Sequence, residues 1–141
     1  MHKISKKIKK RDCANDVFIT PDSLIEQHFK LVEPYLTKED TILDPCCHET
    51  KKYYNKFIAS GYKADWCEIT LNRDFLTYEC NCQAIIGNPP YSMIDDFLSK
   101  IIEVKPRVVS LLIGFGNITT RRLEFMEKSE IIVGKIMRAR C

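Results

Sequence analysis

The stretch Gln83-Ala84-Ile85-Ile86-Gly87-Asn88-Pro89-Pro90-Tyr91 indicates the fold of this chain more clearly than any other segment. It begins with a short, mainly apolar run, which is typical of a strand buried inside a parallel sheet. The two prolines that follow cannot donate hydrogen bonds to a sheet ladder, so the strand has to end before them. We therefore predict a buried strand over residues 83–87 that runs directly into a turn.

The segments on the C-terminal side alternate between helix and strand. Apolar residues at helical spacing indicate a first helix within residues 94–102. A continuous apolar run over residues 108–113 follows, as in a strand covered on both faces. A helix over residues 120–128 and a last strand over residues 131–137 follow. The apolar residues of the first helix are Ile94, Phe97, Leu98, Ile101 and Ile102.

The segments on the N-terminal side alternate in the same way. Strands are expected over residues 41–45 and 62–69, with a helix between them that ends near Gly61. An earlier helix is expected to start at Thr20-Pro21-Asp22, with Thr20 as the cap, Pro21 in the first helical position and Asp22 at the positive end of the helix dipole. Pro34 makes the last turn of that helix doubtful.

This alternation predicts an α/β fold, a mostly parallel sheet with helices on both faces. In such sheets, ligands bind beyond the carboxyl ends of the strands. Asp44, Glu68 and Asn88 all fall at predicted strand ends. Their placement predicts a functional site at this edge of the sheet.

The composition excludes several classes of protein. The chain has 141 residues, the length of one domain, and is 45% hydrophobic and 29% charged, as expected for a packed core. No apolar run approaches the roughly 18 residues that span a bilayer, and no hydrophobic stretch follows the basic N-terminus. Seven cysteines, an odd number, argue against a complete disulfide framework. We expect a cytoplasmic protein rather than a secreted, membrane or fibrous one.

The charge is concentrated at the N-terminus. The net charge is +3, yet residues 1–11 hold six Lys and Arg residues and no acid, so the remainder carries sixteen basic against nineteen acidic residues. A basic arm can bind a phosphate backbone through counterion release, or it can be a solvated tail. We expect a flexible basic tail over residues 1–15 and one folded domain over residues 16–141.

The segment Asn88-Pro89-Pro90-Tyr91 resembles motif IV of the amino-methyltransferases that use S-adenosylmethionine. These enzymes methylate the amino nitrogen of adenine in DNA or RNA, or of a protein glutamine. The resemblance implies that the Asn88 side-chain oxygen and the Pro89 carbonyl accept hydrogen bonds from the target amino group. Pro90 would help to fix the backbone and Tyr91 would stack on the base, which a duplex would have to release by flipping.

Further segments follow in the order that the family requires. Phe18-Ile19-Thr20-Pro21 resembles motif X, Leu43-Asp44-Pro45-Cys46-Cys47 resembles motif I, Glu68 matches motif II, and Arg73-Asp74-Phe75-Leu76 matches motif III. The resemblance implies that Glu68 binds the ribose hydroxyls of the cofactor and that Asp74 binds its adenine amino group. The implied cofactor-binding residues are Thr20, Pro21, Asp44, Pro45, Cys46, Glu68, Asp74 and Phe75.

A closer resemblance is to compact phage- and virus-type DNA methylases. It rests on Trp66-Cys67-Glu68-Ile69, on Arg73-Asp74-Phe75 and on the motif that starts at Asn88. Only residues 69–73 separate Glu68 from Asp74, too few for an intervening helix, and the order of the motifs is that of gamma-type adenine methylases. The resemblance implies a Rossmann-like class I fold, methylation of adenine in DNA, and the host cytoplasm as the location if the protein is viral.

The chain departs from the family at the two glycine positions of motif I, which are His48 and Thr50 here. A β-carbon in the left-handed conformation used there costs about 1–2 kcal/mol, and the His48 ring would lie where the cofactor's methionine end belongs. Asn72, which also replaces a family glycine, tolerates that conformation better. The alternative is therefore a catalytically inactive, methylase-fold module that binds nucleic acid or another partner; RNA or protein-glutamine methylation is a weaker alternative.

Catalytic relatives usually carry a further hairpin and often a separate base-reading region, and nothing in this sequence resembles either. We expect a C-terminally shortened fold that is minimal, truncated or dependent on a partner subunit for target recognition. Zinc is a further alternative, because soft ligands occur on two loops, although their spacings are not those of zinc fingers and we assign no metal site. Those ligands are Cys46, Cys47, His48, Cys80 and Cys82.

Several other residues are expected to have ordinary structural roles. His28 lies between apolar helix positions and is expected to pack, Ser110 lies inside a strand, and Trp66 is expected in the core. Arg121 and Arg122 begin the helix that follows the strand expected over residues 108–113. They could contact phosphates or form a solvated face.

Overall fold

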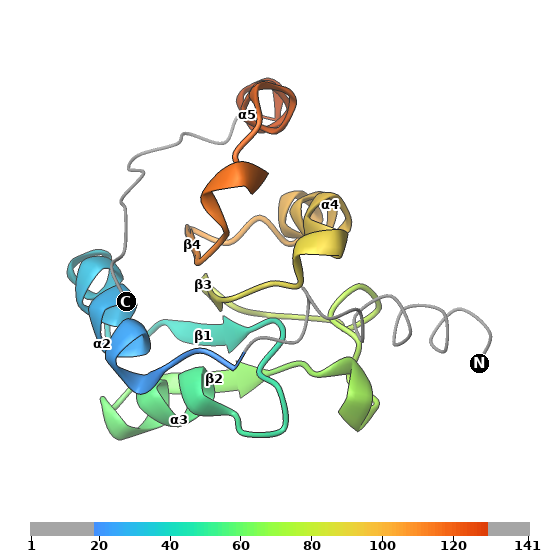
Figure 1. Ribbon diagram of the computed structural model, residues 1–141. Coiled ribbons are helices and arrows are strands. Elements are labelled where there is room, and N and C mark those ends of the chain that lie inside the picture. The colour runs from blue at the N-terminus through green and yellow to red at the C-terminus, as the bar shows by residue number, and fades with distance from the viewer. Residues whose placement is uncertain (1–18, 130–141) are drawn as a thin grey trace.

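Four parallel strands form the sheet of the computed structural model, which describes residues 19–129 (Figure 1). The strands are β1 (Thr41–Asp44), β2 (Lys63–Trp66), β3 (Ala84–Gly87) and β4 (Val108–Leu111), in the order β2-β1-β3-β4. All three neighbouring pairs are parallel. The predicted parallel α/β architecture is confirmed for the described part of the chain.

The described residues form four α-helices that connect these strands. They are α2 (Asp22–Val32), α3 (Lys52–Ala59), α4 (Ile94–Val104) and α5 (Thr120–Lys128). The α5 bounds equal the predicted ones. The longest of these helices has 11 residues, so none in residues 19–129 reaches the roughly 20 apolar residues that cross a bilayer.

Two hydrophobic clusters lie on opposite faces of the sheet, because neighbouring residues of a strand point to opposite sides. In β1, Ile42 belongs to the cluster with Phe29 of α2 and Phe57 of α3, whereas Leu43 belongs to the cluster with Phe97 of α4. Burying one such aliphatic side chain contributes about 1.5–3 kcal/mol. Both faces of the central strands are therefore covered, as their continuous apolar sequences predicted.

The start of α2 differs from the prediction by one position. Pro21 is the N-cap residue, its carbonyl accepts hydrogen bonds from Leu24 N and Ile25 N, and no side chain caps the helix. Thr20 is therefore not the cap. Asp22 does lie in the first turn, and Pro34 does end the regular helix, since it lies in the 3-10 turn η1 (Glu33–Tyr35).

Two predicted strands are shorter than expected. Strand β2 ends at Trp66 because Glu68 forms an isolated antiparallel bridge with Arg73, across the 3-10 turn η2 (Ile69–Leu71). Strand β4 ends at Leu111 and lies at the edge of the sheet that residues 19–129 form. Val109 is 38% exposed, so the expectation that this strand is covered on both faces is wrong.

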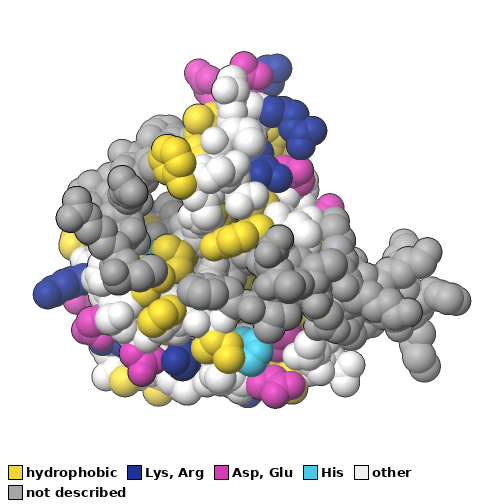
Figure 2. Space-filling view, viewed as in Figure 1, with side chains coloured by type: hydrophobic (Ala, Val, Ile, Leu, Met, Phe, Trp, Pro, Cys, Tyr) yellow, Lys and Arg dark blue, Asp and Glu magenta, His cyan; other side chains and the backbone are white. Residues whose placement is uncertain are grey.

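The basic tail over residues 1–15 and the last predicted strand over residues 131–137 lie outside the described residues. On the face shown in Figure 2, acidic and basic side chains are interspersed, and hydrophobic side chains are exposed near α5. The exposed large hydrophobic side chains of α5 and its preceding 3-10 turn are Phe125 and Phe115.

Candidate functional site

The site lies where the strand order reverses. From β1 the chain continues to β2 on one side and later to β3 on the other, and ligands of open α/β sheets bind at such a point. Gly87 lets the two strand ends approach closely. A β-carbon there would lie 2.9 Å from Pro45 Cδ and 3.0 Å from Asp44 Oδ1. The ends of β1 and β3 therefore form one continuous wall.

A hollow of about 30 Å³ opens beside this wall. Three predicted site residues that are far apart in the sequence meet there. The Asn88 side-chain amide donates to Thr20 Oγ1 (3.1 Å), and the Cys46 thiol donates to the Asn88 carbonyl (2.9 Å). The lining residues are Ile19, Thr20, Ile25, Cys46, Cys47, His48, Thr50, Lys52, Tyr53 and Asn88.

The two ends of the Asn88 amide differ in their surroundings. Its Nδ2 is paired with the Thr20 hydroxyl, whereas its Oδ1 is buried without a hydrogen-bond partner among residues 19–129. A buried acceptor without a partner costs about 1–3 kcal/mol, so native proteins seldom keep one. The hydroxyl of Thr20 therefore holds an amide whose buried acceptor is unpaired among residues 19–129.

The rest of the predicted motif IV lies beside the hollow rather than in its lining. Pro89 and Pro90 are buried, and the Pro90 carbonyl accepts from Met93 N (3.0 Å) to start the next turn. The Tyr91 ring lies against Gly114. Burial raises the pKa of Tyr91. Its role as a stacking platform stays a prediction.

The loop after β1 contains the two residues that replace motif I glycines. His48 is left-handed, with φ 56°, as expected for a glycine position. The second left-handed residue is Lys51, with φ 50°, and not Thr50, so the expectation for Thr50 is wrong. Within this turn, the buried Asp44 carboxylate accepts from Cys46 N (3.2 Å).

Glu68 holds this loop in place. Glu68 is only 1% exposed, and its Oε1 accepts a hydrogen bond from His48 N (2.9 Å). Its Oε2 accepts from both the backbone and the hydroxyl of Thr70, each at 2.9 Å. The carboxylate that the resemblance assigns to the cofactor ribose therefore makes at least three hydrogen bonds within residues 19–129.

Asp74 and Phe75 do not line the hollow. Asp74 Oδ1 accepts from Leu76 N (3.0 Å), which stabilises a local turn. Phe75 is buried with its ring centroid 5.0 Å from that of Phe97, in the cluster on the α4 face. The cofactor contacts predicted for Asp74 and Phe75 stay predictions. The structure shows Phe75 packed in the hydrophobic cluster.

Trp66 is half-buried rather than in the core, because two cations flank its ring. Lys51 Nζ lies 3.8 Å and Arg73 Cζ lies 4.0 Å from the ring centroid. Arg73 also pairs with Asp65 (2.5 Å). This cation–π arrangement ties the β1 loop to the end of β2.

Sequence reasoning missed Tyr53 and Lys52, which line the hollow. The Tyr53 hydroxyl lies 2.7 Å from His28 Nδ1, and His28 Nε2 lies 2.8 Å from Ser110 Oγ. Burial lowers the pKa of His28 to about 4, so this ring is neutral at pH 7. His28 packs as predicted, and Tyr53 carries no sequence signal beyond its helical spacing.

The cysteines of residues 19–129 are free thiols, and no cluster of three metal-ligating side chains was found within that range. Burial raises the pKa of Cys47 to about 12, which disfavours the thiolate that zinc requires. Nothing in the described part of the chain supports the zinc alternative.

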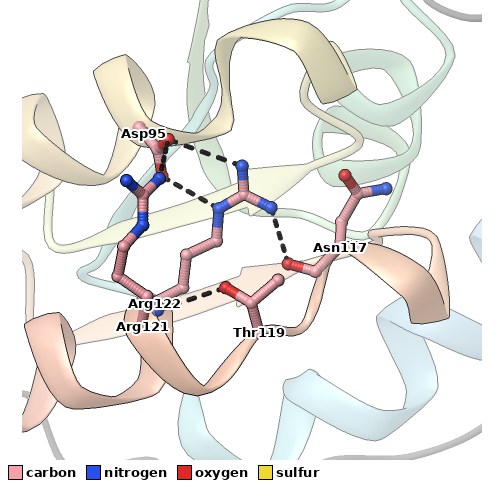
Figure 3. Close-up of polar contacts among 5 residues, drawn as sticks. All are labelled: Asp95, Asn117, Thr119, Arg121 and Arg122. Carbon is pink, nitrogen blue, oxygen red and sulfur yellow. Dashed lines mark hydrogen bonds and ion pairs between the residues drawn. The ribbon is translucent and has the colours of Figure 1, made fainter.

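The two arginines predicted to face phosphates or solvent behave differently (Figure 3). The Arg122 side chain is 18% exposed, donates from Nε to Asp95 (2.8 Å), and donates from Nη1 to the Asn117 carbonyl (2.8 Å). The Arg121 side chain is 80% exposed and contacts Asp95 at 3.1 Å. Arg122 therefore holds α5 against α4, while most of Arg121 faces solvent.

No family model, no curated protein and no solved structure matches this chain. The functional argument therefore depends on the motif residues and on their arrangement in space.

Proposed function

We infer that this protein acts on the amino group of adenine in nucleic acid, with DNA as the substrate and methyl transfer from S-adenosylmethionine as the reaction. A Rossmann-like class I methyltransferase fold is part of the same proposal. The parallel sheet supports it, since the segments that resemble motifs I and IV end adjacent strands at the point of reversal.

The Asn88 side chain is the observation that carries the proposal. An acceptor buried without a partner, fixed from behind by the Thr20 hydroxyl, is suited to a planar amino group, which offers two N–H donors. Accepting one of them favours a nitrogen whose lone pair is less delocalised and points away from the ring. The contribution of Asn88 is thus positioning and electrostatic, and it needs no strong base.

The hollow is small for the cofactor. The hollow has a volume of about 30 Å³, enough for water-sized groups. The Glu68 carboxylate is engaged by His48 N and Thr70. As described, this hollow is smaller than a nucleoside cofactor, and we assign no step through the cofactor.

That observation favours a second candidate function. A methylase fold whose Glu68 holds its own loop closed would bind an adenine base without transferring a methyl group. The two candidates share the Asn88 acceptor and differ in whether the cofactor binds.

Transfer of a radiolabelled methyl group to DNA with and without adenine tests the proposal, beside a cofactor titration. We expect label only in adenine-containing DNA and a loss of about 100-fold or more in Asn88→Ala, the usual effect of removing one positioned polar group. Asn81→Ala, at an exposed asparagine, is the matched control. Adenine-dependent DNA binding without any cofactor binding would reject methyl transfer and leave the second candidate.

A further inference from the structure

Phe115 is the most exposed large hydrophobic side chain among residues 19–129, at 83%. It begins the 3-10 turn η4 (Phe115–Asn117), and glycines lie on both sides of it. A β-carbon on Gly116 would meet no atom within 4 Å, so the space around the backbone is open. A phenylalanine ring exposed to water does not contribute the stabilisation that burial would give. Its position on a loop beside a candidate site therefore indicates a binding role.

The loop that carries Phe115 is bound to the candidate site. Leu112 N donates to the carbonyl of Gly87 (2.9 Å), the residue before Asn88. Two residues later, Gly114 packs on the Tyr91 ring, where a β-carbon would come within 3.3 Å of a ring atom. Phe115 therefore directly follows the residue that contacts the predicted stacking tyrosine.

The loop is also fixed at its other end (Figure 3). The Asn117 carbonyl accepts from Arg122, which Asp95 of α4 holds, and Asn117 N donates to the Gly114 carbonyl (2.8 Å). Thr119 Oγ1 accepts from Arg122 N (3.3 Å) and caps α5. An exposed ring on a loop anchored at both ends is pre-organised, which lowers the entropy lost when a partner binds.

We propose that Phe115 stacks on an unpaired nucleobase of the strand whose adenine is bound at Asn88. This inference rests on the proposed function, which places a nucleic acid strand at this edge. A single ring face suits one base, and base–aromatic stacking is tolerant of sequence. The largely exposed Arg121, on the helix that follows the same loop, supplies a cation for the backbone phosphates.

The test measures binding of a fluorescein-labelled, single-stranded, adenine-containing oligonucleotide by anisotropy. Phe115→Ala is expected to weaken binding about 5- to 150-fold, the range for loss of one stacked base, and Phe115→Trp to retain it. Phe125→Ala is the matched control, since Phe125 is 41% exposed on α5 and should change affinity by less than about twofold. Thermal unfolding of Phe115→Ala should match the parent protein, because the side chain buries little surface.

The outcomes separate this inference from the proposed reaction. Methyl transfer by the parent protein together with full-strength binding by Phe115→Ala would reject the stacking role alone. Weakened binding by Phe115→Ala in a protein that transfers no methyl group would reject the reaction and support the stacking role. Absence of oligonucleotide binding by the parent protein would reject the stacking role as well.

Discussion

His48 holds a left-handed backbone in the loop after β1, and Glu68 accepts the hydrogen bond from its N–H. A non-glycine residue in this conformation is strained by about 1–2 kcal/mol. Its Nδ1 is buried with no hydrogen-bond partner in residues 19–129, and the residue lines the hollow. A strained backbone and an unpaired ring nitrogen at one position indicate a site rather than a structural requirement.

Replacing this residue tests whether its ring limits cofactor binding. We expect His48→Gly to raise the affinity for S-adenosylmethionine about tenfold or more, because it removes the ring from the hollow. Isothermal titration calorimetry measures the change. Lys51→Gly is the matched control, since Lys51 is also left-handed but does not line the hollow. Equal affinities in both variants and the parent would mean that the His48 ring is not the obstacle.

A hydrogen-bond network joins three of the elements around the hollow. His28 of α2 bonds with Tyr53 of α3 on one side and with Ser110 of β4 on the other. Three elements that share only hydrophobic contacts could shift against one another, whereas this hydrogen-bond network fixes their relative positions. Burial disfavours the imidazolium form of His28, and the neutral ring offers one donor and one acceptor nitrogen to the two hydroxyl groups.

The buried His28 of this network makes the free energy of unfolding depend on pH. Burial lowers the folded-state pKa of His28 to about 4, against about 6.5 for an unperturbed histidine. The unfolded chain therefore binds a proton first as the pH falls, and stability is lost between about pH 6.5 and pH 4, by about 3 kcal/mol from this group. Urea unfolding at several pH values measures it. His28→Gln should flatten this part of the profile, and an unchanged slope in that variant would contradict the assignment.

The sequence predicted the elements better than their ends. The bounds of α5 agree with the helix predicted at about residues 120–128, and the Thr119 cap that the structure shows at its start is a local contact. The end of β2 was not predicted, since Glu68 turns back to pair with Arg73 and Asn72 becomes left-handed with φ 61°. Tertiary contacts determine such ends, and a window of neighbouring residues does not contain them.

The candidate site was predicted in part for the same reason. Asn88 was predicted at this edge because it ends a strand of a parallel sheet, and the family resemblance added Thr20 and Cys46, which line the same hollow. The engagement of Glu68 by His48, twenty residues earlier, and the lining role of Tyr53 depend on side-chain directions across the fold. Motif order contains no information on either.

At the scale of the whole molecule, residues of the central strands pack into two hydrophobic clusters, one on each face of the sheet. Each central strand contributes residues to both clusters: in β3, Ala84 and Ile86 belong to one cluster and Ile85 to the other. The two clusters are thus joined through the backbone of β1 and β3 rather than by side chains that touch both. Loss of packing on one face therefore removes support from the strands that the other face needs.

Unfolding should accordingly be a single transition. Phe57→Ala, on the α2 and α3 face, and Phe97→Ala, on the α4 face, should each lower the free energy of unfolding by about 3–5 kcal/mol, because both rings are buried. In both variants, far-ultraviolet circular dichroism and near-ultraviolet signals should change at the same urea concentration, as in the parent protein. Ile58→Ala, at an exposed position of α3, is the control and should change the free energy by less than about 1 kcal/mol. Two separated transitions in either core variant would show that the faces unfold independently, and the coupling through β1 and β3 would then be wrong.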